Sequence, residues 1–289
     1  MWTKRFLFLL IMVAGIGVAS AETLSMRGVK GNGRMQREQR QVGRFDRIVS
    51  LGSMDVRVQQ SPSAQGVVVE AEANVLPLVE TMVRGGVLTI KYKSGSSFST
   101  RRGVRITVTT PVLRSAELRG SGDLHFARGF RQPSLEVSLA GSGDVSFADA
   151  AIDGDLLVNV KGSGDVEGQV MTGGNVRITL LGSGDVSLSL GRPQSVGASL
   201  NGSGDVNLRG ETLHAVLSSA GSGDISCRQL TARRAEVTFR GSGDGELSVI
   251  ERLDIRLTGS SDFVCYGKPA IGEHQVSRSA SFRTVPRKP

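Results

Sequence analysis

The chain has 289 residues, of which 39% are hydrophobic and 21% charged, so its composition excludes an extended disordered protein and allows one large core. The net charge is +8, and only 4% of the residues are aromatic. Because no aromatic residues alternate with the basic ones, we expect no nucleic-acid partner.

Residues 1–21 are typical of a secretory signal peptide. Lys4 and Arg5 precede an apolar run from Phe6 to Ala19, and small residues at Ala19-Ser20-Ala21 form a cleavage site. The run of 14 residues is shorter than the about 20 that a membrane helix needs. We expect cleavage after Ala21, no transmembrane segment afterwards, and a periplasmic, secreted or cell-surface location. A retained N-terminal anchor is the alternative.

Residues 22–44 are predicted to be a basic, disordered leader. This segment is rich in Gly and Gln, has few large apolar residues, and carries six basic side chains: Arg27, Lys30, Arg34, Arg37, Arg40 and Arg44. After signal cleavage 33 basic and 27 acidic residues remain, a net charge of 33 − 27 = +6. Such a charge could attract the leader to anionic envelope polymers or lipid head groups; a merely solvated tail is the simpler interpretation.

Residues 45–111 are predicted to form irregular N-terminal coils of a β-solenoid. A Gly-Ser-Met-Asp sequence begins at Gly52 and is followed by Val56 and Val58, in the pattern of the repeats that come later in the chain. We interpret Ile48 to Gln59 as the first, irregular coil, which is expected to cover the open end. Further strands are expected around Val67, at Val87 to Tyr92 and at Val104 to Thr109, with a possible helical turn between Asn74 and Val83. Atypical terminal units are common in solenoids, because an end unit has to cover the core.

Residues 112–267 hold a regular repeat of Gly-Ser-Gly-Asp. Seven copies begin at Gly120, Gly141, Gly162, Gly182, Gly202, Gly221 and Gly241, and Gly259-Ser260-Ser261-Asp262 continues the series. Successive copies are 21, 21, 20, 20, 19, 20 and 18 residues apart, which indicates a fixed structural period.

Apolar residues alternate with polar ones on both sides of each motif. One residue after the Asp stand Leu124, Val145, Val166, Val186, Val206, Ile225, Gly245 and Phe263. Two residues before the first Gly stand Leu118, Leu139, Val160, Leu180, Leu200, Ser219, Phe239 and Leu257. A period of two predicts two short strands per repeat, with the motif as a tight corner between them. Stacked coils of about 20 residues predict an all-β, parallel β-helix or solenoid.

The tail, residues 268–289, loses the period and contains Pro269, Pro286 and Pro289. It either wraps over the last coil or trails free, and the sequence does not decide between the two.

The motif aspartates form the most conspicuous candidate site. They are Asp123, Asp144, Asp165, Asp185, Asp205, Asp224, Asp244 and Asp262. Stacked at about 4.8 Å, neighbouring carboxylates would repel by about 0.9 kcal/mol even in water, so something must offset the repulsion. We favour backbone N–H donors from Gly and Ser at the corner, together with solvent. Calcium is the alternative, although calcium-binding β-rolls repeat every nine residues and this chain does not.

The two cysteines, Cys227 and Cys265, fall in the same inward column with Leu247 between them. Two coils correspond to about 9–10 Å, whereas a disulfide needs Cα atoms closer than about 7 Å. We therefore expect two buried thiols.

No catalytic constellation emerges from the sequence. His125, His214 and His274 have no metal-ligand spacing, and Ser121 near Asp123 and His125 lacks the nucleophile elbow of a hydrolase. A polysaccharide-processing β-helix would need a carboxylate pair set apart from the uniform ladder, and the only aromatic residues besides Phe are Trp2, Tyr92 and Tyr266. We assign no catalytic, cofactor-binding or metal-binding residues and expect no cofactor.

The chain from about residue 45 to residue 267 resembles the head GIN domain family of putative bacterial autotransporter adhesins, a domain of unknown function. The resemblance rests on Phe45-Asp46-Arg47-Ile48, on Val104-Arg105-Ile106-Thr107-Val108 before Pro111, on the Gly-Ser-Gly-Asp-Val repeats, and on Val264-Cys265-Tyr266-Gly267-Lys268-Pro269. It implies an exported, right-handed β-helical domain at the bacterial envelope. The last 22 residues lack the alternating apolar strands of an outer-membrane barrel.

The sequence therefore favours an exported, non-enzymatic β-solenoid of the cell envelope that binds a surface polymer or a protein partner, neither of which it identifies. The alternatives are a polysaccharide-processing β-helix, a calcium-binding repeat protein, and a structural module whose strand edges pair with another chain. The oligomeric state stays open.

Overall fold

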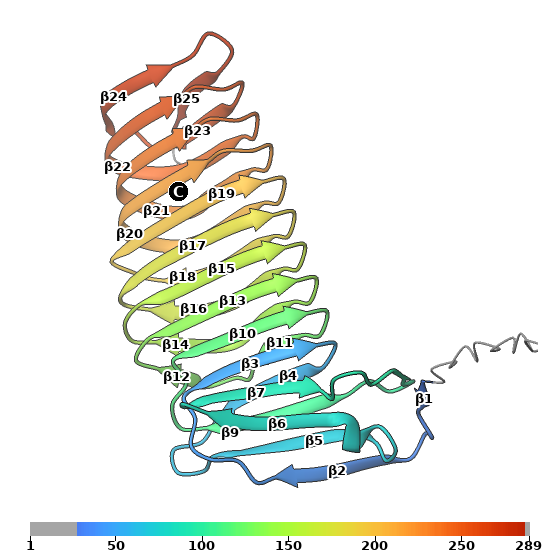
Figure 1. The fold of residues 1–289 in the computed structure, drawn as a ribbon. Helices are drawn as coiled ribbons and strands as arrows, with labels where there is room; N and C mark the ends of the chain where they lie inside the picture. The colour runs from blue at the N-terminus through green and yellow to red at the C-terminus, as the bar shows by residue number, and fades with distance from the viewer. Residues whose placement is uncertain (1–27, 287–289) are drawn as a thin grey trace, which may run out of the picture.

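The computed structural model describes residues 28–286, which form 25 β-strands and one short 3-10 turn (Figure 1). The predicted signal peptide, residues 1–21, lies outside the described residues. Within residues 28–286 there is no helix with the length and apolar character to cross a membrane.

The N-terminal part comprises β1 (Val29–Lys30), β2 (Met35–Arg40), β3 (Arg47–Gly52), β4 (Asp55–Gln60), β5 (Gly66–Glu72), the 3-10 turn η1 (Leu76–Leu78), β6 (Val79–Arg84), β7 (Val87–Tyr92), β8 (Phe98–Ser99) and β9 (Arg105–Thr110). The helical turn expected between Asn74 and Val83 is thus limited to three residues, and a strand follows it.

The repetitive part comprises β10 (Ser115–Gly120), β11 (Leu124–Phe126), β12 (Phe130–Gln132), β13 (Leu135–Gly141), β14 (Val145–Ile152), β15 (Leu156–Gly162), β16 (Val166–Thr172), β17 (Asn175–Gly182), β18 (Val186–Gly191), β19 (Ser195–Gly202), β20 (Val206–Ser219), β21 (Ile225–Phe239), β22 (Gly245–Leu257), β23 (Asp262–Tyr266), β24 (Ala270–Val276) and β25 (Ser281–Val285).

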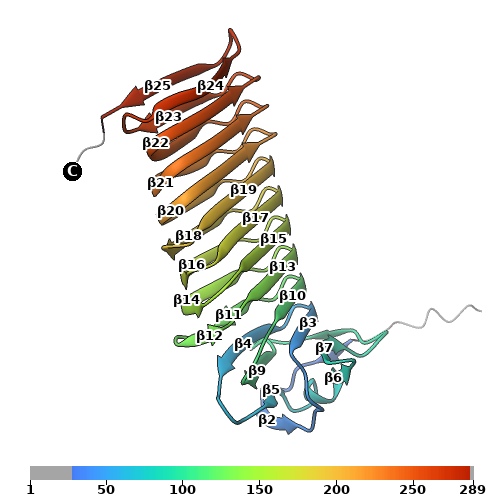
Figure 2. The same cartoon turned by 90° about the vertical axis from the view of Figure 1, so that its left-hand side faces the viewer.

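Successive coils stack in parallel on two faces, as Figures 1 and 2 show. Face A consists of the strands that precede each motif: β10, β13, β15, β17, β19 and the second halves of β20, β21 and β22. Face B consists of the strands that follow the motif: β11, β14, β16, β18 and the first halves of β20, β21 and β22. Gly120 pairs with Gly141, and Gly141 with Gly162, so the register follows the sequence repeat. The prediction of a parallel β-solenoid with two strands per coil is confirmed.

The core lies between the two faces. Val145, Val166, Val186 and Val206, which stack one above another, are all fully buried. Each such side chain contributes about 1.5–3 kcal/mol by leaving water. Since a single coil would leave its inward side chains open to water above and below, this burial exists only in the stack, and the coils stabilise one another.

The Gly52 motif belongs to the array, as predicted. Gly52 pairs with Gly120, and Val56 and Val58 pair with Leu124 and Phe126. The expectation that this coil covers the open end is wrong, because β7 and β9 form a further coil on its other side. The chain therefore builds its second coil in space before its first.

The N-terminal end of the core is closed by antiparallel strands. Strand β5 pairs with β9, and β6 pairs with β7, and the β5 residues Val67, Val69 and Ala71 are fully buried. A change from parallel to antiparallel pairing ends the solenoid here, and Figure 1 shows this cap at one end of the molecule.

The prediction of a disordered leader over residues 22–44 is wrong for Met35–Arg40. These residues form β2, which pairs antiparallel with β5, and Arg40 donates a hydrogen bond to the Leu76 carbonyl (3.0 Å). Without β2, strand β5 would expose an unpaired row of backbone N–H and C=O groups. Both faces of β2 are largely exposed, which is why its sequence is polar and shows no alternation.

The tail does not trail free. Strand β24 pairs with the second half of β22, and β25 pairs with β23, so residues 270–285 form one more coil and the solenoid extends past residue 267. Ser277 and Ser279 replace the motif at this corner, and both hydroxyls donate to the Gly259 carbonyl.

Candidate functional site: a groove along one corner

The motif corner is a densely hydrogen-bonded structural feature. The carbonyl of Gly120 accepts hydrogen bonds from the N–H groups of Ser142 and Gly143 in the next coil (2.9 and 3.2 Å). A Cβ added to Gly141 or Gly143 would lie 2.1 or 1.9 Å from a carbonyl oxygen of the preceding coil. Glycine is needed here because the coils approach closely, and the φ of Gly141 is +149°.

The aspartate ladder is satisfied by the backbone. In each coil one carboxylate oxygen accepts a hydrogen bond from the N–H of the aspartate in the next coil, for instance from Asp144 to Asp123 (3.0 Å) and from Asp224 to Asp205 (2.8 Å). The same contact runs from Asp55 to Asp262 at 2.7–3.3 Å. Backbone N–H donors at the corner are confirmed, but they are not those of Gly and Ser: the donor is the amide of the aspartate in the next coil, whereas the Ser and Gly N–H groups bond a glycine carbonyl.

No metal centre is formed by the residues that the structure describes. Within residues 28–286, no group of three or more His, Cys, Asp and Glu side chains is arranged to hold an ion. Each motif aspartate is one coil from the next, and its carboxylate binds an amide, so the ladder offers no converging set of oxygen ligands.

The cysteines lie where the repeat places them. Cys227 pairs with Leu247, Leu247 pairs with Cys265, and both thiols are free and buried. Burial raises the pKa of Cys227 to about 12 and that of Cys265 to about 11. Both side chains are therefore protonated at neutral pH and act as apolar core residues.

The histidines do not form a site together. His125 Nδ1 lies 2.8 Å from Ser146 Oγ on the next coil, and burial followed by the nearby Arg57 charge lowers the pKa of His125. His214 lies beside Glu236 (3.3 Å), and His274 packs against Phe282. The triad-like group of Ser121, Asp123 and His125 is not assembled, since His125 contacts Ser146.

A groove follows the other corner, where the chain passes from face B back to face A. It is made up of three adjoining hollows. The first hollow begins at Arg131, and both it and the second hollow are lined by Arg192 and Glu211. Leu213 lines both the second and the third hollow. The third ends at Asp254. We call this continuous depression the corner groove. It crosses the coils from β12 to β22, and so it runs along the axis of the solenoid.

Exposed apolar and cationic side chains alternate along the corner groove. Met171, Leu213 and Ile250 come from every second coil and expose 56%, 57% and 52% of their surface. Arg192 and Arg233 come from the coils between them and also line the groove. Leaving large apolar side chains exposed in one row is unfavourable in water, so such a row indicates a contact surface.

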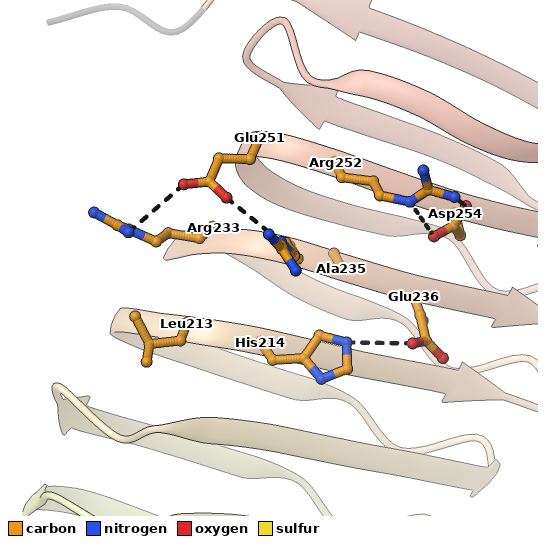
Figure 3. A pocket seen from close by; sticks show the side chains of 9 residues that line it. Leu213, His214, Arg233, Ala235, Glu236, Glu251, Arg252 and Asp254 are labelled. Atoms are coloured by element: carbon orange, nitrogen blue, oxygen red, sulfur yellow. Dashed lines mark hydrogen bonds and ion pairs between the residues drawn. The ribbon is translucent and has the colours of Figure 1, made fainter.

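Ion pairs hold the charged side chains of the groove in place. Arg192 pairs with Glu211 (3.3 Å), and Glu251 bridges Arg233 (3.6 Å) and Arg234 (3.5 Å). Figure 3 shows the Glu251 bridge, with Leu213 on the neighbouring strand. Each pair is solvent-exposed and stabilises the fold little, but it restricts the directions in which the guanidinium groups point.

Sequence reasoning missed the corner groove. The columns were counted from the motif, and the chain length between motifs varies by up to three residues, so the opposite corner had no common register. The available signal was an apolar residue in a polar stretch, such as Ile250 before Glu251 and Arg252 or Leu213 before His214.

The fold is a β-solenoid, and the corner groove is a solvent-exposed depression along its length. The chain belongs to the family described as "Putative auto-transporter adhesin, head GIN domain", which matches it over residues 44–171 and 157–269. The resemblance noted from the sequence is thereby confirmed. Membership indicates an exported or surface protein. No curated protein matches the chain.

Solved structures share the fold. A putative lipid binding protein from Parabacteroides distasonis is 24% identical, with a TM-score of 0.63 over 90% of this chain and 100% of that one. A putative adhesin from Parabacteroides merdae is 18% identical (TM-score 0.60; 89% and 99%), and another from Parabacteroides distasonis is 20% identical (TM-score 0.59; 89% and 100%). At these identities the similarity concerns the fold.

Proposed function

We propose that this protein is an exported, non-enzymatic binding module of the bacterial cell envelope, and that the corner groove is its binding surface. The observation that carries the proposal is the row of Met171, Leu213 and Ile250, exposed in alternation with Arg192 and Arg233. Export is supported by the signal-like residues 1–21 and by the family.

The chemistry of the groove favours a protein partner over a polysaccharide. Met and Arg are enriched in protein interfaces, where an apolar contact is combined with hydrogen-bond donors. Sugar rings are usually held on aromatic platforms, and neither Trp nor Tyr lines the three hollows. An envelope polymer remains the second class of partner.

The test compares residues 22–289 with a triple variant, Met171→Ser, Leu213→Ser and Ile250→Ser. Retention of envelope proteins and envelope polysaccharides is measured on immobilised protein, and newly released chain ends are measured in the same samples. The expected result is retention by the unmodified protein, loss of retention in the triple variant, and no released ends.

A matched control carries Val112→Ser and Leu181→Ser, which remove exposed apolar side chains outside the groove (43% and 39% exposed). This control should bind like the unmodified protein. Equal retention by the triple variant would refute the groove as the binding surface, and release of chain ends would refute the non-enzymatic function.

A further inference from the structure

The two ends of the solenoid differ in how they finish the core. At the N-terminal end β2, β5 and β6 close it, whereas the other end finishes in β24 and β25 (Figures 1 and 2). Within residues 28–286, β24 pairs only with β22, and β25 pairs only with β23. Both strands therefore present an unpaired backbone edge, which is a template for another strand.

The core is also uncovered at this end. Leu253 and Phe263 are fully buried, while Ile271 and Phe282, which pair with them one coil further on, are exposed and half-buried. His274, which pairs with the buried Ile255, is exposed as well. The inward columns thus continue to the last coil, but nothing among the described residues lies over it.

A second copy of the same end matches this surface in shape. Strands β24 and β25 lie on opposite faces and run in opposite directions. A two-fold axis parallel to the strands therefore places β24 of one copy over β25 of the other in antiparallel orientation. Both apolar cross-sections then have the same outline, so Ile271 and Phe282 of each copy cover the core of the other.

The charges match in the same arrangement. Glu273 points outward near the middle of β24, and Arg283 points outward near the middle of β25. The two-fold axis brings Glu273 of each copy beside Arg283 of the other, giving two symmetric ion pairs.

We propose that two copies of this chain associate through their C-terminal coils, with β24 of each pairing antiparallel with β25 of the other. The result is a closed, two-fold symmetric rod with an N-terminal cap at each outer end. The two strands contribute 12 residues per copy, fewer than the about 20–30 of a standard interface, so we expect a dissociation constant in the range of about 1–100 µM.

The experiment is sedimentation of residues 22–289 over a concentration series, with Glu273→Arg, Arg283→Glu and the double variant. Each single variant places like charges together and should raise the dissociation constant about tenfold or more. The double variant restores opposite charges and should recover the affinity of the unmodified protein. Glu167→Arg, an exposed position in the middle of face B, is the matched control and should not change association.

Thermal melting of each variant separates association from local folding. Glu273 also pairs with Arg256 of its own chain, so Glu273→Arg loses that contact in addition. A folding defect in Glu273→Arg would persist in the double variant, whereas an intermolecular effect is reversed there. A monomer at every concentration would overturn the proposal, as would a dimer that neither single variant weakens.

Discussion

At the motif corner Gly184 and Gly204 occupy the same position in successive coils, whereas at the opposite corner the register shifts and the bends hold Leu213, Arg233 and Ile250 in turn. At the first corner a Cβ added to Gly184 or Gly204 would lie 2.1 or 1.9 Å from a carbonyl oxygen of the preceding coil. The second projects its side chains into solvent. Close packing fixes the sequence of one corner and leaves the other free to vary, and the candidate binding surface lies where it varies.

The sharpest way to break this comparison is the same glycine substitution at the motif corner and at an open position on face A. Gly204→Ala places a Cβ 1.9 Å from the Gly184 carbonyl oxygen, and we expect a loss of stability above about 4 kcal/mol or failure to fold. Gly197→Ala, in β19 on face A, meets no atom nearer than 3.9 Å and should be neutral or stabilise by about 0.4–1 kcal/mol. Urea unfolding measures both. Equal changes in the free energy of unfolding for the two variants would show that the close approach of the coils at the motif corner does not exclude a Cβ.

The next effect concerns the thiols in the core behind the motif corner. The pKa of Cys227 is raised from its ordinary 9.0 to about 12, so the folded state favours the neutral thiol. Stability is then unaffected below pH 9 and falls as pH rises from 9 towards 12, because only the unfolded chain loses the proton. Between pH 9 and pH 10 the loss for Cys227 is about 1 kcal/mol.

Urea unfolding at pH 8, 9 and 10 tests this against Cys227→Ala, in which the alkaline loss should be smaller by that amount. As a control, a thiol-labelling reagent at pH 8 should react with Cys227 and Cys265 only after the protein has been unfolded, because both thiols are buried. A disulfide between Cys227 and Cys265, detected by mass, would contradict the register described above.

A smaller effect is expected from the aspartate ladder. Asp205→Ala removes the acceptor for the Asp224 amide and should cost about 1 kcal/mol, part of it offset by relief of repulsion between neighbouring carboxylates. Asp205→Asn keeps an oxygen acceptor and loses the charge, so it should be neutral or slightly stabilising. The two variants are compared by their urea midpoints. If both lost the same stability, the negative charge rather than the hydrogen bond would matter.

Removal of divalent cations is expected to have no effect. The ladder carboxylates bind backbone amides, so the melting temperature in excess EDTA should equal that in added calcium. A fall of many degrees in EDTA would restore the calcium-binding hypothesis and show that the amide contacts do not suffice.

The repeat could be predicted because the number of residues in each coil is nearly constant and can be counted along the sequence. Val166 and Val186 fall in one column through the length of the coil alone, and the Gly52 coil was recognised by the same counting. The order of the first two coils could not be predicted, since spatial order does not follow chain order where a segment is inserted. Strand β2 escaped detection because it is exposed on both faces, and the last coil because His274 and Thr284 interrupt its inward columns.

The direction of the aspartate ladder has a consequence for how such a protein can evolve. Each coil from Asp123 to Asp244 brings one carboxylate acceptor and one amide donor, so a duplicated segment of about 20 residues inserts there with its contacts complete on both sides. The family matches this chain in two overlapping segments, in keeping with internal duplication. Each duplication would lengthen the molecule by about 4.8 Å without new core contacts having to arise. Length is thus a trait that selection can adjust in single steps of one coil.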